Sequence, residues 1–255
     1  MSKPNILFWD LETSLQPVAV FQLTHNDYIN PESLLAERYI ICASWRWDGE
    51  NKVHSVAVTD DAKRYAADPH DDYFVVEALH KVLSKADVIV HHNGDSFDKK
   101  YLDTRILVHG LPALPPIPSI DTYKVAKARF YLNSNKLDYI GKLLKVGRKI
   151  PTSPGLWMRV LQGDAKAVLE MVRYNKADVI LLQNVFTKLI PYIPNYMSLE
   201  FFGETGCPRC GSSSVQSRGV HRAITRVYQR FYCNDCGGWF RRLRTTEKAT
   251  ENRVL

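Results

Sequence analysis

The sequence lacks the features that mark membrane, secreted and disulfide-rich proteins. It contains no run of 18 apolar residues, so no membrane span is expected. Its first apolar run stops at Asp10, too early for the core of a signal peptide. Five cysteines in 255 residues are too few for a disulfide scaffold. We therefore expect a cytoplasmic protein with no membrane contact, built as one large core or a core with a small module.

Lysine is absent from residues 207–244, which instead hold eight arginines and one acid, Asp235. Residues 1–206 carry 24 basic and 24 acidic side chains, so the net charge of +7 arises in this short block. A local block of arginine favours contact with phosphate, since the guanidinium group forms forked hydrogen bonds and stacks on bases. The alternative is an ordinary solvated surface.

The same block holds two C-x-x-C-G turns, CPRCG and CNDCG, with 22 residues between Cys210 and Cys233. In a chain without a secretion signal this spacing predicts a metal site, and each glycine permits a tight turn. The intervening RAITRVYQRFY is β-prone, so we predict a structural zinc ribbon, with an iron–sulfur cluster as the alternative. The fifth cysteine, Cys42, lies in an apolar run and is predicted to be a core residue. The predicted zinc ligands are Cys207, Cys210, Cys233 and Cys236.

Apolar periodicity upstream of the ribbon predicts an α/β fold in which strands and helices alternate. The predicted strands are residues 5–9, 38–47, 52–58, 87–93 and a short one within 115–123; the predicted helices are residues 74–86, 97–110, 135–144 and 164–189, with an irregular loop at 147–163. Asp164 is the predicted N-cap of the last helix and Pro191 its stop. The predicted domains are 1–190, a linker at 191–204, the basic ribbon at 205–245 and a tail at 246–255.

Acidic residues recur at the ends of these elements. Asp10 and Glu12 are two apart at the end of the first strand, so they share one face. Two carboxylates about 4 Å apart repel by about 4 kcal/mol at an effective dielectric constant of 20, and a hard divalent cation would offset this cost. Asp98 lies just inside the second helix. Tyr174 and Asp178 are four apart on the last helix and therefore neighbours on one face.

Three ordered motifs carry a family resemblance: D-L-E-T at 10–13, N-x-x-x-F-D at 93–98 and Y-x-x-x-D at 174–178. Together they resemble the exonuclease motifs of the DEDD superfamily in its tyrosine-bearing subclass. The segments IDTYKVAK and NKLDYIGKLL add to a likeness with the proofreading exonuclease domain of family B DNA polymerases, over residues 5–188. The resemblance implies a ribonuclease H-like mixed sheet with flanking helices, here without a polymerase domain.

The resemblance also implies roles for individual residues. Asp10, Glu12, Asp98 and Asp178 would hold two Mg²⁺ or Mn²⁺ ions, and Tyr174 would orient the attacking water. Asn93 and Phe97 would contact the substrate, although Phe97 could equally be a core aromatic. Leu11 and Thr13 would line the pocket for the terminal nucleotide. Related enzymes place a lysine on the scissile phosphate, and here Lys136, Lys142 and Lys149 all remain candidates.

Other polar residues near these motifs are given structural roles. Asp95 is interpreted as a helix N-cap, and Asp121 and Asp138 as structural acids. His91 and His92 are interpreted as packed side chains, because the histidine-bearing DEDD subclass carries its histidine in the third motif, where this chain has Tyr174.

The resulting hypothesis is a metal-dependent 3′→5′ exonuclease acting on DNA, preferentially single-stranded. In the ribbon, Arg222, Arg226 and Arg230 are interleaved with aromatics and would grip the strand or a DNA 3′ end. The alternatives are a non-catalytic nucleic-acid-binding protein, an exoribonuclease with the same site, and a ribbon that docks proteins instead. Replication or repair proteins are further candidate partners.

Overall fold

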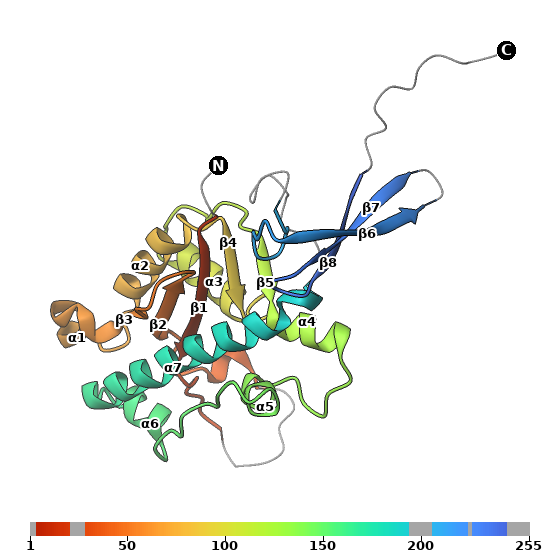
Figure 1. Ribbon diagram of the computed structural model, residues 1–255. Helices are drawn as coiled ribbons and strands as arrows, with labels where there is room; N and C mark the ends of the chain where they lie inside the picture. Colours follow the sequence, from red (N-terminus) through yellow and green to blue (C-terminus); the bar gives the residue numbers. More distant parts are fainter. Residues whose placement is uncertain (1–3, 21–28, 194–205, 224–225, 244–255) are drawn as a thin grey trace. The chain divides into compact units, whose positions relative to one another are not determined.

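The computed structural model describes residues 4–20, 29–193, 206–223 and 226–243. The chain divides into two structural units, one of residues 5–187 and one that joins residues 188–255 to 1–4. Most of the predicted linker at 191–204 and the whole tail at 246–255 lie outside the described residues. Figure 1 follows the elements from β1 to β8.

The first unit is built on a five-stranded mixed sheet with strand order β3-β2-β1-β4-β5. Its strands are β1 (Ile6–Thr13), β2 (Ile40–Trp47), β3 (His54–Ala57), β4 (Val88–His91) and β5 (Ser119–Asp121). β1 pairs antiparallel with β2 and parallel with β4, so it lies at the centre of the sheet. The predicted neighbouring strands at 38–47 and 52–58 form a hairpin, since β2 and β3 pair antiparallel around Asp48-Gly49 and Gly49 has a φ of +91°. This is a ribonuclease H-like fold.

Alternate side chains of β1 point to opposite faces of the sheet. Leu7, Trp9 and Leu11 are buried in a core shared with α2 (Tyr73–Leu83) and α3 (Asp98–Val108). Phe8 has the opposite parity, and its ring meets Phe186 of α7 (Ala165–Leu189) edge-on at 5.1 Å. Asp10 and Glu12 share the parity of Phe8, so they face α7, which runs across the sheet in Figure 1.

The remaining helices are all short. They are η1 (Pro31–Ser33), η2 (Val58–Asp60), α1 (Ala62–Ala67), α4 (Thr122–Arg129), α5 (Leu137–Leu143), α6 (Leu156–Leu161) and η3 (Ile190–Tyr192). The prediction of an irregular loop over 147–163 is wrong in part, because α6 forms within it. Gly155, at a φ of +67°, starts α6, and Leu156 and Val160 bury its inner face. Asp164 caps α7 as predicted, since its carboxylate accepts from the amide of Lys166 at 2.9 Å.

The second unit contains a three-stranded antiparallel sheet in the order β6-β7-β8, formed by β6 (Val215–Arg222), β7 (Val227–Cys233) and β8 (Trp239–Leu243). The two cysteine turns precede β6 and follow β7. Gly211 and Gly237 end these turns at φ values of +74° and +71°, and each donates its amide to the carbonyl of the first cysteine of its turn. This is the predicted zinc-ribbon architecture. No helix in the described part of the chain is long and apolar enough to cross a membrane.

Candidate active site and metal centres

Three of the predicted acidic ligands converge between β1 and α7. Ligand oxygens of Asp10, Glu12 and Asp178 all lie within 4.8 Å of one another. The β1 alternation supplies the first two, and α7 supplies the third from the opposite side. Two segments that are more than 160 residues apart in sequence therefore form one carboxylate cluster.

The fourth predicted acid, Asp98, approaches the same place from the first turn of α3. Its Oδ1 accepts the backbone amide of Leu11 at 3.4 Å, between the two acids of β1. Asp98 lies outside the tight group of three. Its charge nevertheless acts on them, because it is among the carboxylates that raise the pKa of Asp10 and of Glu12.

Burial and mutual repulsion make the acidic cluster costly to ionise. Burial, followed by the charges of Asp98 and Glu12, raises the pKa of Asp10 well above its ordinary value. Burial raises the pKa of Glu12 to about 8 and that of Asp98 to about 6. Burial also raises the pKa of Asp178, although Lys149 counteracts part of this shift. Positive charge is what this cluster lacks.

The donor set fits a hard divalent cation. Carboxylate oxygens are the ligands that Mg²⁺ and Mn²⁺ prefer. In addition, Oδ1 of Asp178 is buried and has no hydrogen-bond partner among the described residues, so one ligand atom remains unsatisfied. A buried carboxylate oxygen in this state costs free energy that a metal ion would offset.

Of the three candidate lysines, Lys149 lies beside the carboxylate cluster. Its Nζ donates to Oδ2 of Asp178 at 2.5 Å and to the hydroxyl of Tyr174 at 2.9 Å. Lys142 instead pairs with Asp138, and Lys136 is exposed. Asp138 has the structural role expected of it, since its Oδ1 accepts the amide of Lys149 and fixes this part of the loop.

Asn175 is a site residue that the sequence reasoning missed. It is fully buried, and its Nδ2 donates to Oδ2 of Asp10 at 2.6 Å. Its spacing of three from Asp178 places it on the same helical face, and this signal was available in the sequence. Asn175 fixes the orientation of the Asp10 carboxylate from α7.

The predicted substrate contacts fall in different surroundings. Phe97 is 38% exposed and stacks on Tyr101 at 5.8 Å, so it is not a core aromatic. Asn93 is exposed, at a φ of +66°, and Thr13 is half-buried at the end of β1. Leu11 is only 4% exposed and packs in the core. This burial argues against a substrate contact by the Leu11 side chain, while its backbone amide serves Asp98.

The polar residues after β4 form a network that holds the connection to α3. The carboxylate of Asp95 binds His91 at 3.0 Å, Ser119 at 2.5 Å and Lys124 at 2.7 Å. The interpretation of Asp95 as a helix N-cap is therefore wrong. The N-cap residue of α3 is Phe97, whose side chain makes no capping hydrogen bond, and Asp95 instead binds side chains of β4, β5 and α4.

Asp121 and the two histidines have the structural roles expected of them. Asp121 caps α4 and also accepts the amide of Asn93. His91 is fully buried, and both ring nitrogens of His92 are hydrogen-bonded, to Thr122 and to the carbonyl of Asn135. Although His91, Asp95 and Asp121 lie close enough to share an ion, the carboxylates of Asp95 and Asp121 already accept hydrogen bonds from Ser119 and from backbone amides.

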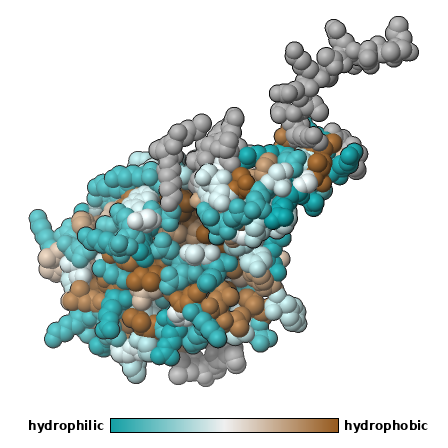
Figure 2. Space-filling view, in the orientation of Figure 1, coloured by the Kyte–Doolittle hydropathy of each residue, from teal (hydrophilic) through white to brown (hydrophobic). Residues whose placement is uncertain are grey.

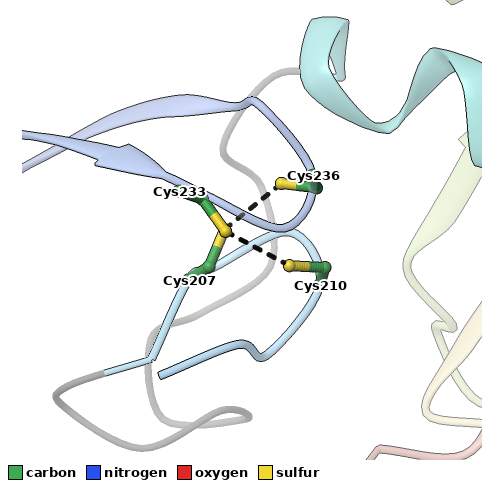
Figure 3. Close-up of side chains that lie close together, drawn as sticks. All are labelled: Cys207, Cys210, Cys233 and Cys236. Atoms are coloured by element: carbon green, nitrogen blue, oxygen red, sulfur yellow. Dashed lines mark hydrogen bonds between the residues drawn. The ribbon is translucent and has the colours of Figure 1, made fainter. Parts of the chain in front are cut away.

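The four ribbon cysteines form a second candidate metal centre. All four sulfur atoms lie within 4.8 Å of one another, with separations of 3.7 Å for Cys207–Cys236 and 3.6 Å for Cys210–Cys233. Figure 3 shows the side chains pointing toward one another from the two turns. A tetrahedral ion with metal–sulfur bonds of about 2.3 Å requires sulfur separations of about 3.8 Å. The cluster therefore fits a tetrahedral thiophilic ion.

Fold and carboxylate cluster together define a ribonuclease H-like protein with a candidate metal site. A family model described as the RNase_H superfamily matches residues 45–190, more than half of the chain. The chain belongs to the RNase_H superfamily, whose members are typically nucleases that use divalent metal ions. The match includes Asp98, Tyr174 and Asp178, whereas Asp10 and Glu12 precede it.

A solved structure supports the fold. The family B DNA polymerase from the hyperthermophilic archaeon Pyrobaculum calidifontis matches with a TM-score of 0.54 and 15% sequence identity, over 90% of this chain. The match spans 32% of the polymerase chain. No curated protein sequence matches the chain.

Proposed function

We propose that this protein is a metal-dependent 3′→5′ exonuclease that hydrolyses phosphodiester bonds, preferentially in single-stranded DNA. The observation that carries the proposal is the convergence of Asp10, Glu12 and Asp178 beside the Lys149–Tyr174 pair. One ammonium group and one hydroxyl thus lie beside a carboxylate cluster, in a superfamily whose members are typically nucleases.

Asp10, Glu12, Asp98 and Asp178 would hold two Mg²⁺ or Mn²⁺ ions. Such ions, when bound, would withdraw charge from the phosphodiester and lower the pKa of an attacking water. The protein's own contribution is to hold these carboxylates in place. Asn175 holds Asp10, the amide of Leu11 holds Asp98, and Lys149 holds Asp178.

Lys149 and Tyr174 would act on the reacting groups directly. The hydroxyl of Tyr174 accepts a hydrogen bond from Lys149, which holds it beside the carboxylate cluster, where it would orient a water. Burial raises the pKa of Tyr174, which keeps this hydroxyl protonated at neutral pH. The ammonium group of Lys149 would stabilise negative charge that develops on the phosphoryl oxygens.

In the proposed reaction, a water oxygen bonds to phosphorus and the bond from phosphorus to the 3′ oxygen of the preceding nucleotide breaks. That oxygen leaves with a proton, and the other product is a 5′-mononucleotide. Asn93, Phe97 and Thr13 are the proposed contacts to the terminal nucleotide. The exposed ring of Phe97 suits stacking on an unpaired base, which supports the preference for single strands.

The second unit would bind one structural Zn²⁺ and nucleic acid. Four thiolates close a zinc coordination shell, so this site is proposed to be structural. The arginine block of residues 207–244 would contact phosphates of the strand. Replication or repair proteins are proposed further partners.

The test is hydrolysis of DNA and RNA oligonucleotides, single- and double-stranded, labelled at the 5′ or the 3′ end, with Mg²⁺, Mn²⁺ or chelator. We expect mononucleotides released from the 3′ end of single-stranded DNA, and no turnover with chelator or in Asp178→Asn. Turnover on RNA alone would assign an exoribonuclease. Binding without turnover under any of these conditions would refute the enzyme and favour a non-catalytic binding protein.

A further inference from the structure

One face of the ribbon sheet gathers rings and guanidinium groups. In the antiparallel register, Arg230 of β7 pairs with Arg241 of β8, and Tyr232 pairs with Trp239. Paired residues project to the same side, and residues two apart along a strand do so as well. The aromatic–arginine face therefore consists of His221, Tyr228, Arg230, Tyr232, Trp239 and Arg241.

The other face of this sheet is occupied by the ribbon's own core. Phe231 stacks on Phe240 at 5.3 Å beside the buried Cys207 and Cys233. The rings of the aromatic–arginine face are therefore not needed to cover the metal centre. Trp239 is 51% exposed, and its ring meets Tyr232 at 5.3 Å. A large aromatic surface is thus open to solvent.

No anion among the described residues neutralises the two arginines of this face. Like charges directly opposite one another on neighbouring strands are destabilising, so the Arg230–Arg241 pair costs free energy. Within the described ranges neither residue forms an ion pair. Asp235, the only acid of residues 207–244, accepts a hydrogen bond from Ser212 instead. Arg241 lies over the ring of Tyr228 at 4.6 Å, which holds its guanidinium group at the surface.

A pocket of about 250 Å³ joins the rings to the charges. His221, Arg230, Trp239, Phe240 and Arg241 line it. Its volume lies just below the range of sites for whole drug-sized ligands, so it suits one planar group. In Figure 2 the visible ribbon strands are mostly hydrophilic with a few hydrophobic residues among them.

We propose that the aromatic–arginine face binds a single-stranded polynucleotide, with one base stacked against Trp239 and the adjacent phosphates on Arg230 and Arg241. Every base has a π-face, so stacking on Trp239 is open to any unpaired strand and closed to bases within a duplex. Two adjacent unneutralised guanidinium groups match successive phosphates. The inference rests on the proposed function in taking the ligand to be the nuclease's own substrate, and it assigns a binding site apart from the carboxylate cluster.

The experiment measures binding of a labelled oligothymidylate by fluorescence anisotropy across a salt series. The full chain carries Asp10→Asn to prevent hydrolysis. We expect Trp239→Ala to weaken binding roughly 5- to 100-fold with an unchanged salt slope. We expect Arg230→Ala and Arg241→Ala each to reduce the slope of log Kd against log salt by about 0.7. Bound zinc and circular dichroism establish that each variant is folded.

Two control variants distinguish binding by this face from a general effect of positive charge. Arg222 pairs with Val227, so its side chain has the parity of the opposite face. Arg222→Ala removes the same charge from the same sheet and should reduce the salt slope less than Arg230→Ala. Lys63, exposed on α1, gives a charge-matched variant outside the ribbon, Lys63→Ala, with no expected effect. Equal slopes for Arg222→Ala and Arg230→Ala, or unchanged affinity in Trp239→Ala, would overturn the inference.

Failure of this inference is distinguishable from failure of the exonuclease proposal. Hydrolysis of a trinucleotide by the parent protein reports on the carboxylate cluster, because so short a strand offers few bases and phosphates to a second binding site. Trinucleotide hydrolysis together with unchanged oligothymidylate affinity in Trp239→Ala would refute the ribbon site and support the nuclease. No trinucleotide hydrolysis together with weakened affinity in Trp239→Ala would support the ribbon site and refute the nuclease. Weakened binding of an acidic peptide, but not of DNA, in the face variants would assign a protein-docking ribbon and refute the proposal.

Discussion

Among the described residues, Lys149 is the one cation that forms an ion pair with the carboxylate cluster. Lys149→Met would remove this charge while keeping most of the side-chain volume. Asp178 is 3% exposed and pairs with Lys149 at 2.5 Å. Removing one partner of a buried ion pair typically destabilises a protein by about 3–5 kcal/mol, because the remaining charge is left uncompensated. Since the Lys149 side chain is 35% exposed, we expect the lower end, about 3 kcal/mol.

This loss translates into a measurable shift in thermal unfolding. For a domain of 150–250 residues, each kcal/mol shifts Tm by about 2–4 °C, so Lys149→Met should lower Tm by about 6–12 °C without divalent ions. Mg²⁺ should restore more of the Tm in this variant than in the parent, because the ion no longer competes with the ammonium group for Asp178. Turnover should remain lost, because the ammonium group that would stabilise charge on the phosphoryl oxygens is absent.

Lys142→Met is the matched control. Lys142 pairs with Asp138, also at 2.5 Å, but the two side chains are 56% and 32% exposed. Such a surface pair is typically worth about 0–1 kcal/mol, so the control should shift Tm by no more than about 4 °C and keep its activity. Equal Tm shifts in the two variants, or full activity in Lys149→Met, would refute the reasoning about burial and charge.

Three further predictions test the rest of the site. Burial raises the pKa of Glu12 to about 8 and that of Asp98 to about 6, so the folded state binds more protons than the unfolded one. Without divalent ions, Tm should therefore fall as pH rises from 5.5 to 8, and it should fall less with Mg²⁺. A Tm that does not change with pH would contradict this. Asn175→Ala should lower kcat roughly 10-fold at similar KM because Asp10 loses its partner, whereas the exposed Asn184→Ala should not. Cys236→Ser should release zinc, measured by metal analysis, and open residues 206–243 to protease, because metal binding supplies most of the stability of so small a unit.

The acids of β1 could be predicted because their signal is local. Strand alternation alone places Asp10 and Glu12 on one face, and helical spacing alone places Tyr174 and Asp178 together. The same rules predict that Phe8 faces the way Asp10 does. They do not say which helix covers that face. The Phe8–Phe186 contact supplies that information, and it depends on tertiary packing.

Lys149 could not be chosen from the sequence because its position depends on the path of a loop. The three candidate lysines have the same chemistry and lie within 14 residues of one another. Lys149 reaches the site because Asp138 binds its backbone amide and because Gly147, at a φ of +140°, turns the chain beside Leu181. Neither constraint has a periodic signature. The two-turn helix α6 was missed for the same reason, since it lies between glycines and is too short for periodicity to show.

Two sets of charges in this chain are left incompletely neutralised, and they have opposite sign. Lys149 neutralises only part of the carboxylate cluster, and the paired Arg230 and Arg241 of the ribbon have no ion-pair partner in the structure described. Each arrangement costs stability that hydrophobic burial in its own unit must offset. A nucleic acid bound with divalent ions carries both missing charges, cations for the acids and phosphates for the arginines. One ligand therefore accounts for both costs, whereas a protein partner for the ribbon would leave the acids unexplained.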